Sequence, residues 1–301
     1  MKIEIPTKSV PGFSLPVLGL GTWRMGGEVN RDPANDDARD IAAIVAAIDA
    51  GVTHIDTAEV YAEGWAERFV GEVIRQRGRQ GIFITSKVLA THLRHDDVIA
   101  ACRGSLERIG IKQLDLYLVH APNREVPLNE TMRALDWLRE HELIRFAGVS
   151  NFHVPLLEEA VTHTKYGIVN NQFHYSLSAR AYEENGTVEF CRRHGILVTA
   201  YRPIGRSGEL SRHGVRLLDE ISEKYGKTPA QVAVNWVVAQ PNVVTLVKTS
   251  DPRHLQEDLG ALGWQLAPDD VTRLRDEFPQ GQTINVPDAP PTSPHRRTSY
   301  Y

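Results

Sequence analysis

The segment from His54 to Tyr61, which reads HIDTAEVY, carries two side chains that suit proton transfer. Asp56 directly follows a short apolar run, and Tyr61 comes five residues later. A free phenol has a pKa of about 10 and is therefore a poor acid at neutral pH. A cation beside the phenol would stabilise its anion, and a carboxylate would hold that cation in place. The segment therefore predicts two partners, a buried lysine and a group that binds a substrate oxygen.

Regular elements must position these partners, and the chain alternates short apolar runs with amphipathic helices. Continuous apolar runs are typical of parallel strands that are buried on both faces. We predict eight strands, at residues 17–20, 53–55, 82–85, 114–119, 144–149, 168–171, 197–200 and 243–247. We predict helices after them, at residues 37–50, 65–77, 96–109, 128–140, 154–162, 181–194, 215–225, 229–240 and 252–259.

Eight strand–helix units favour an α/β fold of the (β/α)8 TIM-barrel type. A doubly wound open sheet is the alternative, but no GxGxxG fingerprint follows the first strand. Residues 1–16 predict a β-hairpin cap outside the main sheet, with strands at 2–5 and 13–15 around a Pro11–Gly12 turn. An extra helix at 268–277 and an irregular C-terminal tail at 281–301 complete one expected domain, residues 1–301.

In a barrel of this type the active site forms at the carboxyl ends of the strands. Polar, aromatic or glycine residues follow nearly every predicted strand: Gly21, Thr22, Trp23, Asp56, Tyr61, Ser86, Lys87, His120, Ser150, Asn151, Asn171, Gln172, Tyr201, Lys248, Thr249 and Ser250. Taken singly, Lys87 suits a surface position and Asp56 suits a helix N-cap. Their shared position at strand ends favours a common site instead.

Four of these residues suit one reaction. Lys87, held by Asp56, would lower the free energy of the Tyr61 anion. Tyr61 can then give a proton to a carbonyl oxygen, or take one from an alcohol. A neutral His120 would donate a hydrogen bond to that oxygen. A proton donor aimed at a carbonyl suits hydride addition from a nicotinamide.

The bulk composition excludes several classes of protein. The net charge of −4 argues against a nucleic-acid binder. No apolar run of about 18 residues is present, so we expect no membrane span. The N-terminus lacks the apolar core of a signal peptide, and the two cysteines are far apart. We expect a cytoplasmic monomer that acts on a small molecule, without a metal.

Beyond these arguments, the whole chain resembles the aldo-keto reductase superfamily, as a bacterial-type member. The matching motifs are GLGTW at 19–23, HIDTAEVY at 54–61, VGEVI at 70–74, ITSK at 84–87, LDLYLVH at 114–120, GVSNF at 148–152, NNQ at 170–172 and PAQVAVNWV at 229–237. The resemblance implies a catalytic tetrad of Asp56, Tyr61, Lys87 and His120, with Tyr61 as general acid. It also implies reduction of aldehydes or ketones with NADPH as the usual hydride source.

The resemblance assigns cofactor contacts residue by residue. Gly21, Thr22, Trp23 and Asp56 belong to this set. Ser150, Asn151 and Gln172 match residues that hold the nicotinamide carboxamide, and Tyr201 matches the aromatic that stacks on the ring. Arg202, Pro203, Ile204 and Gly205 lie where the family grips the pyrophosphate, and Arg202 replaces a common serine.

Lys248, Thr249 and Ser250 match the loop around the adenosine 2′-phosphate. Here the chain departs from the family, because His254 replaces an arginine and Asp258 replaces an asparagine, while Glu257 matches. A mostly neutral histidine cannot clamp phosphate as a guanidinium does. We expect Arg253 to compensate, NADPH to be preferred and NADH to be used appreciably.

For the substrate, the resemblance points to Trp23, Val60, Tyr61, Leu89, His120 and Ala121. Leu89 and Ala121 stand where some members carry tryptophan, which predicts a wider pocket closed by the tail from Gly281. Arg24 and Arg124 lie at its rim, and we expect them to be solvated loop residues.

Three other functions are compatible with parts of the chain. A nucleotide-binding, redox-sensing or regulatory subunit with low turnover is the main alternative. A Schiff-base lyase would use Lys87 as a nucleophile, although pairing with Asp56 would keep the amine protonated. The group His92, His95 and Asp96 has a spacing that suits a metal site, but it opens a surface helix.

Overall fold

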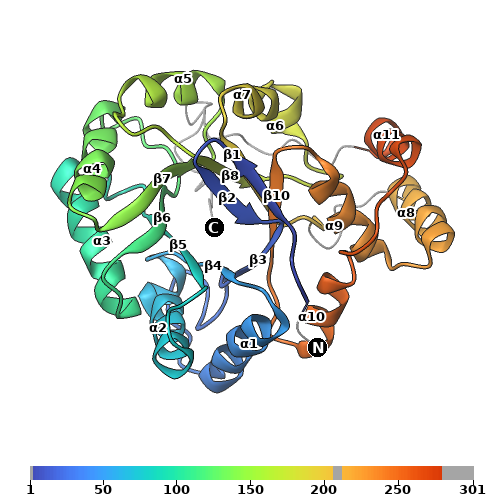
Figure 1. Ribbon diagram of the computed structural model, residues 1–301, viewed down its shortest axis with the longest axis horizontal. Coiled ribbons are helices and arrows are strands. Elements are labelled where there is room, and N and C mark those ends of the chain that lie inside the picture. Colours follow the sequence, from blue (N-terminus) through green and yellow to red (C-terminus); the bar gives the residue numbers. More distant parts are fainter. Residues whose placement is uncertain (1–2, 206–211, 280–301) are drawn as a thin grey trace, which may run out of the picture.

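The computed structural model describes residues 3–205 and 212–279. Within these residues, eight parallel strands close into a barrel with helices around it (Figure 1). The strands follow the order β10-β3-β4-β5-β6-β7-β8-β9 around the barrel. Their bounds are β3 (Leu18–Gly21), β4 (His54–Asp56), β5 (Phe83–Val88), β6 (Leu114–Val119), β7 (Ile144–Ser150), β8 (Asn170–His174), β9 (Leu197–Tyr201) and β10 (Val243–Val247). The predicted barrel is confirmed, and the pairing of Thr245 with Leu18, which joins the last strand to the first, excludes the open sheet.

Helices connect the strands and cover the outside of the barrel. In the described part of the chain the α-helices are α1 (Asp37–Ala50), α2 (Trp65–Arg77), α3 (His95–Ile109), α4 (Leu128–Glu140), α5 (Val154–Thr162), α6 (Ala181–Glu184), α7 (Thr187–Arg193), α8 (Arg212–Tyr225), α9 (Pro229–Ala239), α10 (Pro252–Leu259) and α11 (Pro268–Glu277), and a short 3-10 helix, η1 (Tyr61–Gly64), precedes α2. Local sequence sets several of their ends. The side chain of Asp36 accepts a hydrogen bond from the backbone of Arg39 and starts α1. Thr228 and Gln231 form a reciprocal capping box at the start of α9.

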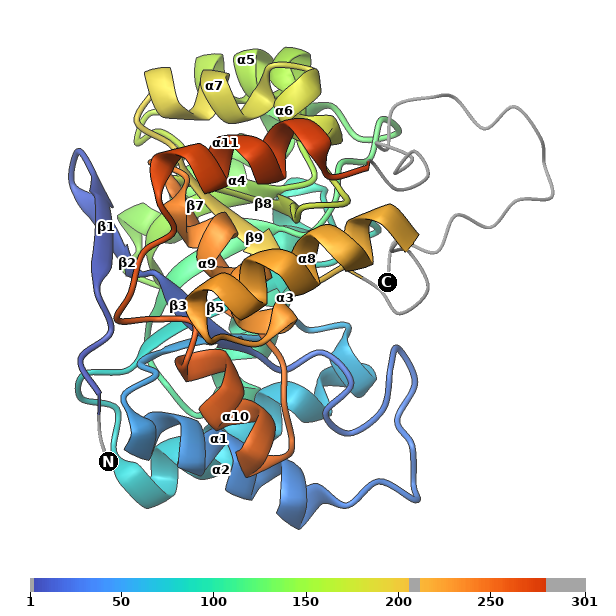
Figure 2. The ribbon, with the colours of Figure 1, turned by 90° about the vertical axis from the view of Figure 1, so that its right-hand side faces the viewer.

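A hairpin of β1 (Thr7–Val10) and β2 (Phe13–Pro16) closes one end of the barrel (Figure 2). Phe13 makes edge contacts with the rings of Phe83 and Phe146, at centroid distances of 6.1 and 5.0 Å. These partners lie near the amino ends of β5 and β7. The hairpin therefore forms a floor beneath the barrel, as the sequence predicted, and leaves the carboxyl ends of the strands open.

The first strand of this hairpin lies elsewhere than predicted. The structure places it at Thr7–Val10 and not at residues 2–5. Gly12 adopts a φ of 75°, so the two-residue turn brings Val10 directly opposite Phe13, and pairing extends outward from there. Ile3 instead donates a backbone hydrogen bond to Ala50 at the end of α1.

The predicted helix over residues 181–194 is also corrected, because the structure divides it into α6 and α7. The side chain of Asn185 accepts from the backbone and the hydroxyl of Thr187. Gly186 has a φ of 83°, which a continuous helix does not allow. The Asn-Gly pair therefore ends one helix and starts the next. The extra helix is confirmed as α11, and the predicted tail at 281–301 lies outside the described residues.

Lys8 fastens the hairpin floor to the barrel. Its ammonium donates to three backbone carbonyls, those of Val238 at 2.5 Å, Gln240 and Val243 at 2.8 Å. We expect Lys8→Met to lower the free energy of unfolding by ~1–3 kcal/mol, because it leaves these carbonyls without a donor. Thermal denaturation measures the effect. Lys165→Met removes an exposed ammonium and should leave the melting temperature nearly unchanged; an equal loss in both variants would contradict the prediction.

Candidate active site

The barrel brings the predicted reactive side chains to the open end of the strands. Asp56 is the last residue of β4, and Lys87 lies in β5. His120 follows β6, and Ser150 ends β7. All four are buried. Residues far apart in the sequence thus share one end of the barrel because parallel strands end there together.

The Lys87 ammonium has three hydrogen-bond acceptors, one for each of its protons. It donates to Asp56 Oδ1 at 2.5 Å, to the carbonyl of Thr57 at 2.8 Å and to the Tyr61 hydroxyl at 3.2 Å. The phenol oxygen is therefore an acceptor in this contact, and its own proton remains for another partner. The second carboxylate oxygen of Asp56 accepts from Gln172 Nε2 at 2.8 Å.

Burial and charge act in opposite directions on this group. Burial raises the pKa of Tyr61 above its usual value, while the Lys87 ammonium acts to lower it. The phenol is therefore protonated at neutral pH, as a proton donor must be. Burial acts to lower the pKa of Lys87, but Asp56 and Tyr61 hold it above the usual value. The amine consequently stays charged, which argues against a Schiff-base nucleophile.

His120 lies beside the phenol. The rings of Tyr61 and His120 are 5.6 Å apart between centroids and meet at 72°. Burial, together with the charge of Lys87, lowers the pKa of His120 well below its usual value. The imidazole is therefore neutral at physiological pH and presents both a donor and an acceptor nitrogen.

A second group of polar side chains lines the opposite part of the site. Asn151 Nδ2 donates to the carbonyl of His120 at 3.1 Å and to Ser150 Oγ at 3.0 Å. The Tyr201 hydroxyl donates to Asn151 Oδ1 at 3.0 Å. This network orients the Asn151 amide and the Tyr201 ring relative to His120.

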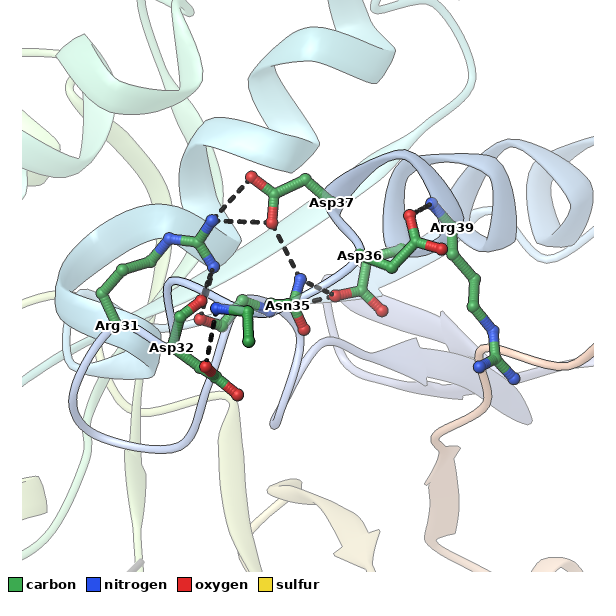
Figure 3. Close-up of polar contacts among 9 residues, drawn as sticks. Arg31, Asp32, Asn35, Asp36, Asp37 and Arg39 are labelled. Carbon is green, nitrogen blue, oxygen red and sulfur yellow. Dashed lines mark hydrogen bonds and ion pairs between the residues drawn. The ribbon is translucent and has the colours of Figure 1, made fainter.

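The loop between β3 and α1 forms another wall and carries Trp23. The rings of Trp23 and Tyr61 meet at 66° with centroids 5.0 Å apart. Arg31 holds the loop by donating to Gly26 O and to both oxygens of Asp37 (Figure 3). Asp40, at the start of α1, accepts from the backbone of Gly26 at 3.0 Å.

Several residues next to the site have left-handed backbone conformations. In the described residues, non-glycine positive φ values occur at Arg24, Ala62, Glu63, Glu142, Asn151 and Arg202. The backbone amides of Ala62 and Glu63 donate to the carbonyls of Glu28 and Val29 in the Trp23 loop. Such conformations cost energy and persist where the surroundings fix them. The Trp23 loop therefore fixes the backbone that follows Tyr61.

A cavity of about 260 Å³ connects these groups. Its lining residues are Gly21, Trp23, Asp56, Tyr61, His120, Ser150, Asn151, Gln172, Tyr201, Arg202, Pro203, Ile204, Gly205, Leu246, Val247, Lys248 and Asp258. Most residues that the sequence assigned to the cofactor therefore face one space. Leu246 and Val247 were missed, because apolar residues inside a predicted strand give no signal of ligand contact.

Other predicted residues lie around this cavity or away from it. Lys87 is buried behind Asp56, and Thr22 Oγ1 donates to the carbonyl of Asp56 at 3.1 Å. Val60 and Leu89 pack beside Tyr61. Ala121 is buried next to His120. Arg24 pairs with Glu28 at 2.6 Å and is exposed, as expected, and Arg124 is also exposed.

The β10–α10 loop, residues 248–251, forms the remaining end of the cavity. Lys248 Nζ donates to Ser250 Oγ at 3.1 Å, and Ser250 Oγ donates to Asp40 Oδ1 at 2.9 Å. Desolvation lowers the pKa of Lys248; Asp40 opposes this shift, while Arg24 and Arg39 add to it. Lys248 therefore lies in an electrostatic cluster with two arginines and one aspartate.

The polar residues of α10, which follows this loop, differ in whether they face the cavity. Arg253, which we expected to supply the missing guanidinium, pairs with Asp251 at 2.8 Å and 3.2 Å. His254 is exposed on α10. Glu257 accepts from Thr228 Oγ1 at 2.9 Å. Only Asp258 of this group lines the cavity, and Thr249 turns its hydroxyl to the carbonyl of Asp251.

The donor set fits a nicotinamide dinucleotide. Ser150, Asn151 and Gln172 offer hydroxyl and amide groups, Tyr201 offers an aromatic face, and Lys248 offers a cation at another part of the same cavity. The fold and site together define a barrel oxidoreductase that combines a protonated phenol with a dinucleotide site.

Comparisons with known proteins agree with this class. The sequence model of the aldo/keto reductase family matches residues 17–277, and the chain belongs to that family. It is 33% identical over 272 residues to the 9,11-endoperoxide prostaglandin H2 reductase of Trypanosoma cruzi, covering 90% of each chain. It is 32% identical to the methylglyoxal reductase YeaE of Escherichia coli, covering 88% and 92%. The chain is thus an NAD(P)H-dependent oxidoreductase of aldehydes and ketones, as its sequence predicted.

Solved structures show the same likeness. The thermostable aldo-keto reductase Tm1743, in complex with the inhibitor epalrestat, has a TM-score of 0.87 at 39% identity, covering 90% of this chain and 99% of that one. An aldo-keto reductase from Klebsiella pneumoniae in complex with NADPH has a TM-score of 0.81 at 32% identity, covering 93% and 98%.

The described residues contain neither a helix that could span a membrane nor a cluster of metal ligands. None of their helices has the length and apolarity needed to cross a bilayer. No set of three or more potential ligands among them is arranged to hold a metal ion. His92 contacts Glu59 at 3.1 Å and His95 contacts Asp96 at 2.8 Å, so the two histidines have separate partners.

Proposed function

We propose that this chain reduces small aldehydes and ketones with NADPH, and that Tyr61 is the proton donor. The observation that carries this proposal is the Lys87 contact with the Tyr61 hydroxyl at 3.2 Å. Because Lys87 donates to the phenol oxygen, the phenol proton is directed to other acceptors. A carbonyl oxygen beside Tyr61 and His120 would receive that proton as its negative charge develops.

Each tetrad residue has a role that follows from its contacts. Lys87 stabilises the tyrosinate that remains after the proton leaves, and Asp56 holds Lys87 in place. His120, being neutral, donates a hydrogen bond that orients the carbonyl oxygen. In the opposite direction, the tyrosinate takes the proton from an alcohol.

The remaining cavity residues would hold the dinucleotide. Ser150, Asn151 and Gln172 suit the carboxamide, and Tyr201 suits the nicotinamide ring. Gly21, Thr22, Trp23 and the segment 202–205 would line its path, and the β10–α10 loop would receive the adenosine phosphate, with His254, Glu257 and Asp258 nearby. When bound, NADPH supplies the hydride for the carbonyl carbon. The NADPH complex of the K. pneumoniae relative supports this choice of cofactor.

The test is a steady-state assay of the purified chain with NADPH or NADH and a panel of carbonyls that includes methylglyoxal, the substrate in the name of the E. coli relative. We expect turnover with both cofactors and a preference for NADPH. Binding of NADPH without turnover on any reactive aldehyde would favour a low-turnover regulatory subunit.

We also propose that residues 1–301 form one domain that acts as a cytoplasmic monomer. The family match over residues 17–277 supports one domain. Cys102 and Cys191 are both free and buried, which suits a reducing compartment. In the described residues the large exposed hydrophobic side chains are Trp65, Tyr166, Ile204 and Val215. Light scattering of the protein as it elutes from a size-exclusion column measures its molar mass and tests the monomer.

Asp258 predicts a pH dependence of cofactor binding. Burial, followed by the charge of Glu257, raises the pKa of Asp258 to about 7. Below pH 7 this carboxyl is neutral, and above pH 7 it is an anion that repels a nearby phosphate. We therefore expect Asp258→Asn to bind NADPH about three- to tenfold more tightly than the parent at pH 8, with little difference at pH 6.

Titration calorimetry at both pH values measures this difference. The phosphate of NADPH also ionises in this range, but it does so equally in both proteins, so the ratio of the two dissociation constants isolates Asp258. An unchanged ratio between pH 6 and pH 8 would show that Asp258 does not face the phosphate.

A further inference from the structure

The β10–α10 loop has a second cationic neighbour that comes from a distant part of the sequence. Arg39 lies in the first turn of α1, and its Nε donates to the carbonyl of Ser250 at 3.1 Å. In Figure 3 its side chain leaves the Arg31–Asp37 cluster and extends toward the segment that follows β10. The guanidinium of Arg39 is thus attached to the loop that carries Lys248.

The rest of this guanidinium is available. Across residues 3–205 and 212–279, no carboxylate forms an ion pair with Arg39, and its two Nη atoms make no hydrogen bond. The neighbouring carboxylate of Asp40 is already engaged, because it accepts from Gly26, Asn35 and Ser250. Arg253, in contrast, already forms an ion pair with Asp251, which accepts from Nε and Nη2 along one edge of its guanidinium.

The two arginines therefore differ in what they can offer a ligand. Arg253 is closer in sequence to the loop, but the Asp251 carboxylate already balances its charge and occupies one edge of its guanidinium. Arg39 can offer two N–H groups of a rigid fork without losing a contact. Lys248, whose Nζ contacts Ser250 Oγ at 3.1 Å, lies on the same loop. Together they suit a dianionic, tetrahedral group.

We propose that Arg39 is a specificity-determining residue that binds the 2′-phosphate of NADPH together with Lys248. This inference rests on the proposed function, since it assumes that the dinucleotide occupies the cavity. It assigns this phosphate contact to a guanidinium of α1, because on α10 His254 is exposed and Arg253 is paired with Asp251. Selection of NADPH over NADH then depends on a contact between the first and last strand–helix units of the barrel.

The experiment compares Arg39→Ala with Arg253→Ala and the parent protein. Fluorescence titration and calorimetry would give dissociation constants for NADPH, NADH, adenosine 2′,5′-bisphosphate and AMP. We expect Arg39→Ala to weaken NADPH and the bisphosphate by ~10- to 100-fold and to leave NADH and AMP within about twofold. Arg253→Ala should bind all four like the parent. Melting curves check that both variants fold.

The outcomes separate the possible failures. An equal loss for phosphorylated and unphosphorylated ligands would mean that Arg39 only positions the loop, and would overturn the inference. No loss at all would also overturn it. If the parent protein binds neither dinucleotide, the proposed function itself fails, and the inference falls with it. Arg39→Lys should restore part of the bisphosphate affinity, because charge returns without the fork.

Discussion

Replacement of Tyr61 with phenylalanine should reduce kcat for carbonyl reduction by about 10²- to 10⁴-fold, which is the range for loss of a general acid. Lys87 and His120 remain in place, but neither is arranged to replace the phenol: the ammonium is bound to Asp56 and Thr57, and the imidazole is neutral. NADPH affinity should stay within about threefold, because the ring is retained. Single-turnover kinetics and equilibrium binding measure the two quantities separately.

Tyr182→Phe is the matched control for this variant. The Tyr182 phenol is also buried, and it has no hydrogen-bond partner among the described residues. Its removal changes the same chemical group outside the reaction centre, so turnover should be unaffected. If Tyr61→Phe kept most of its turnover, the phenol would not be the proton donor.

Replacement of Lys87 with methionine should have the second large effect. Without the ammonium, the rise in the pKa of Tyr61 that burial causes loses its main opponent, and only the weaker effect of Arg202 still acts to lower this pKa. The tyrosinate becomes less stable, and we expect kcat to fall by about 10²- to 10³-fold, as for loss of a preorganised electrostatic group. Alcohol oxidation needs the tyrosinate as its base. Because a higher pKa delays formation of that base, the rising part of its pH profile should move to higher pH.

Among the described residues, this variant also leaves the buried Asp56 carboxylate with Gln172 as its one side-chain donor, so the variant should be less stable. The double variant Lys87→Met, Asp56→Asn removes that charge. It should regain much of the lost melting temperature and none of the turnover. A recovery of turnover together with stability would assign Lys87 a structural role instead. An unchanged pH profile in Lys87→Met would contradict its effect on the phenol.

Much of this architecture could be predicted from the sequence. The apolar runs identified all eight barrel strands because parallel strands buried on both faces leave a continuous pattern. That pattern of strands also predicted that Asp56, Lys87 and His120 lie at one end of the barrel. The hairpin was harder, since residues 2–5 alternate as a strand does and yet lie too far from the Pro11–Gly12 turn to pair around it.

The errors have physical reasons. Gln172 donates to Asp56 across 116 positions, and Ser250 donates to Asp40 across 210. No local pattern records such contacts. Arg253 was expected to face the cofactor because of its place in the sequence, but Asp251 is two residues away and takes up its guanidinium. The left-handed backbone at Ala62 is likewise invisible, because alanine gives no signal for that conformation.

The hairpin floor has a practical consequence for handling the enzyme. The strands β1 and β2 close the amino ends of the barrel strands, and Ile3 donates a backbone hydrogen bond to Ala50 at the end of α1. Ile3, at the start of the described chain, therefore lies at the face opposite the reactive groups. An affinity tag or a solid support attached before Ile3 would hold the molecule at the amino-end face of the barrel. The substrate entrance at the other end would then face the solution. Immobilised preparations should then retain the KM of the free enzyme.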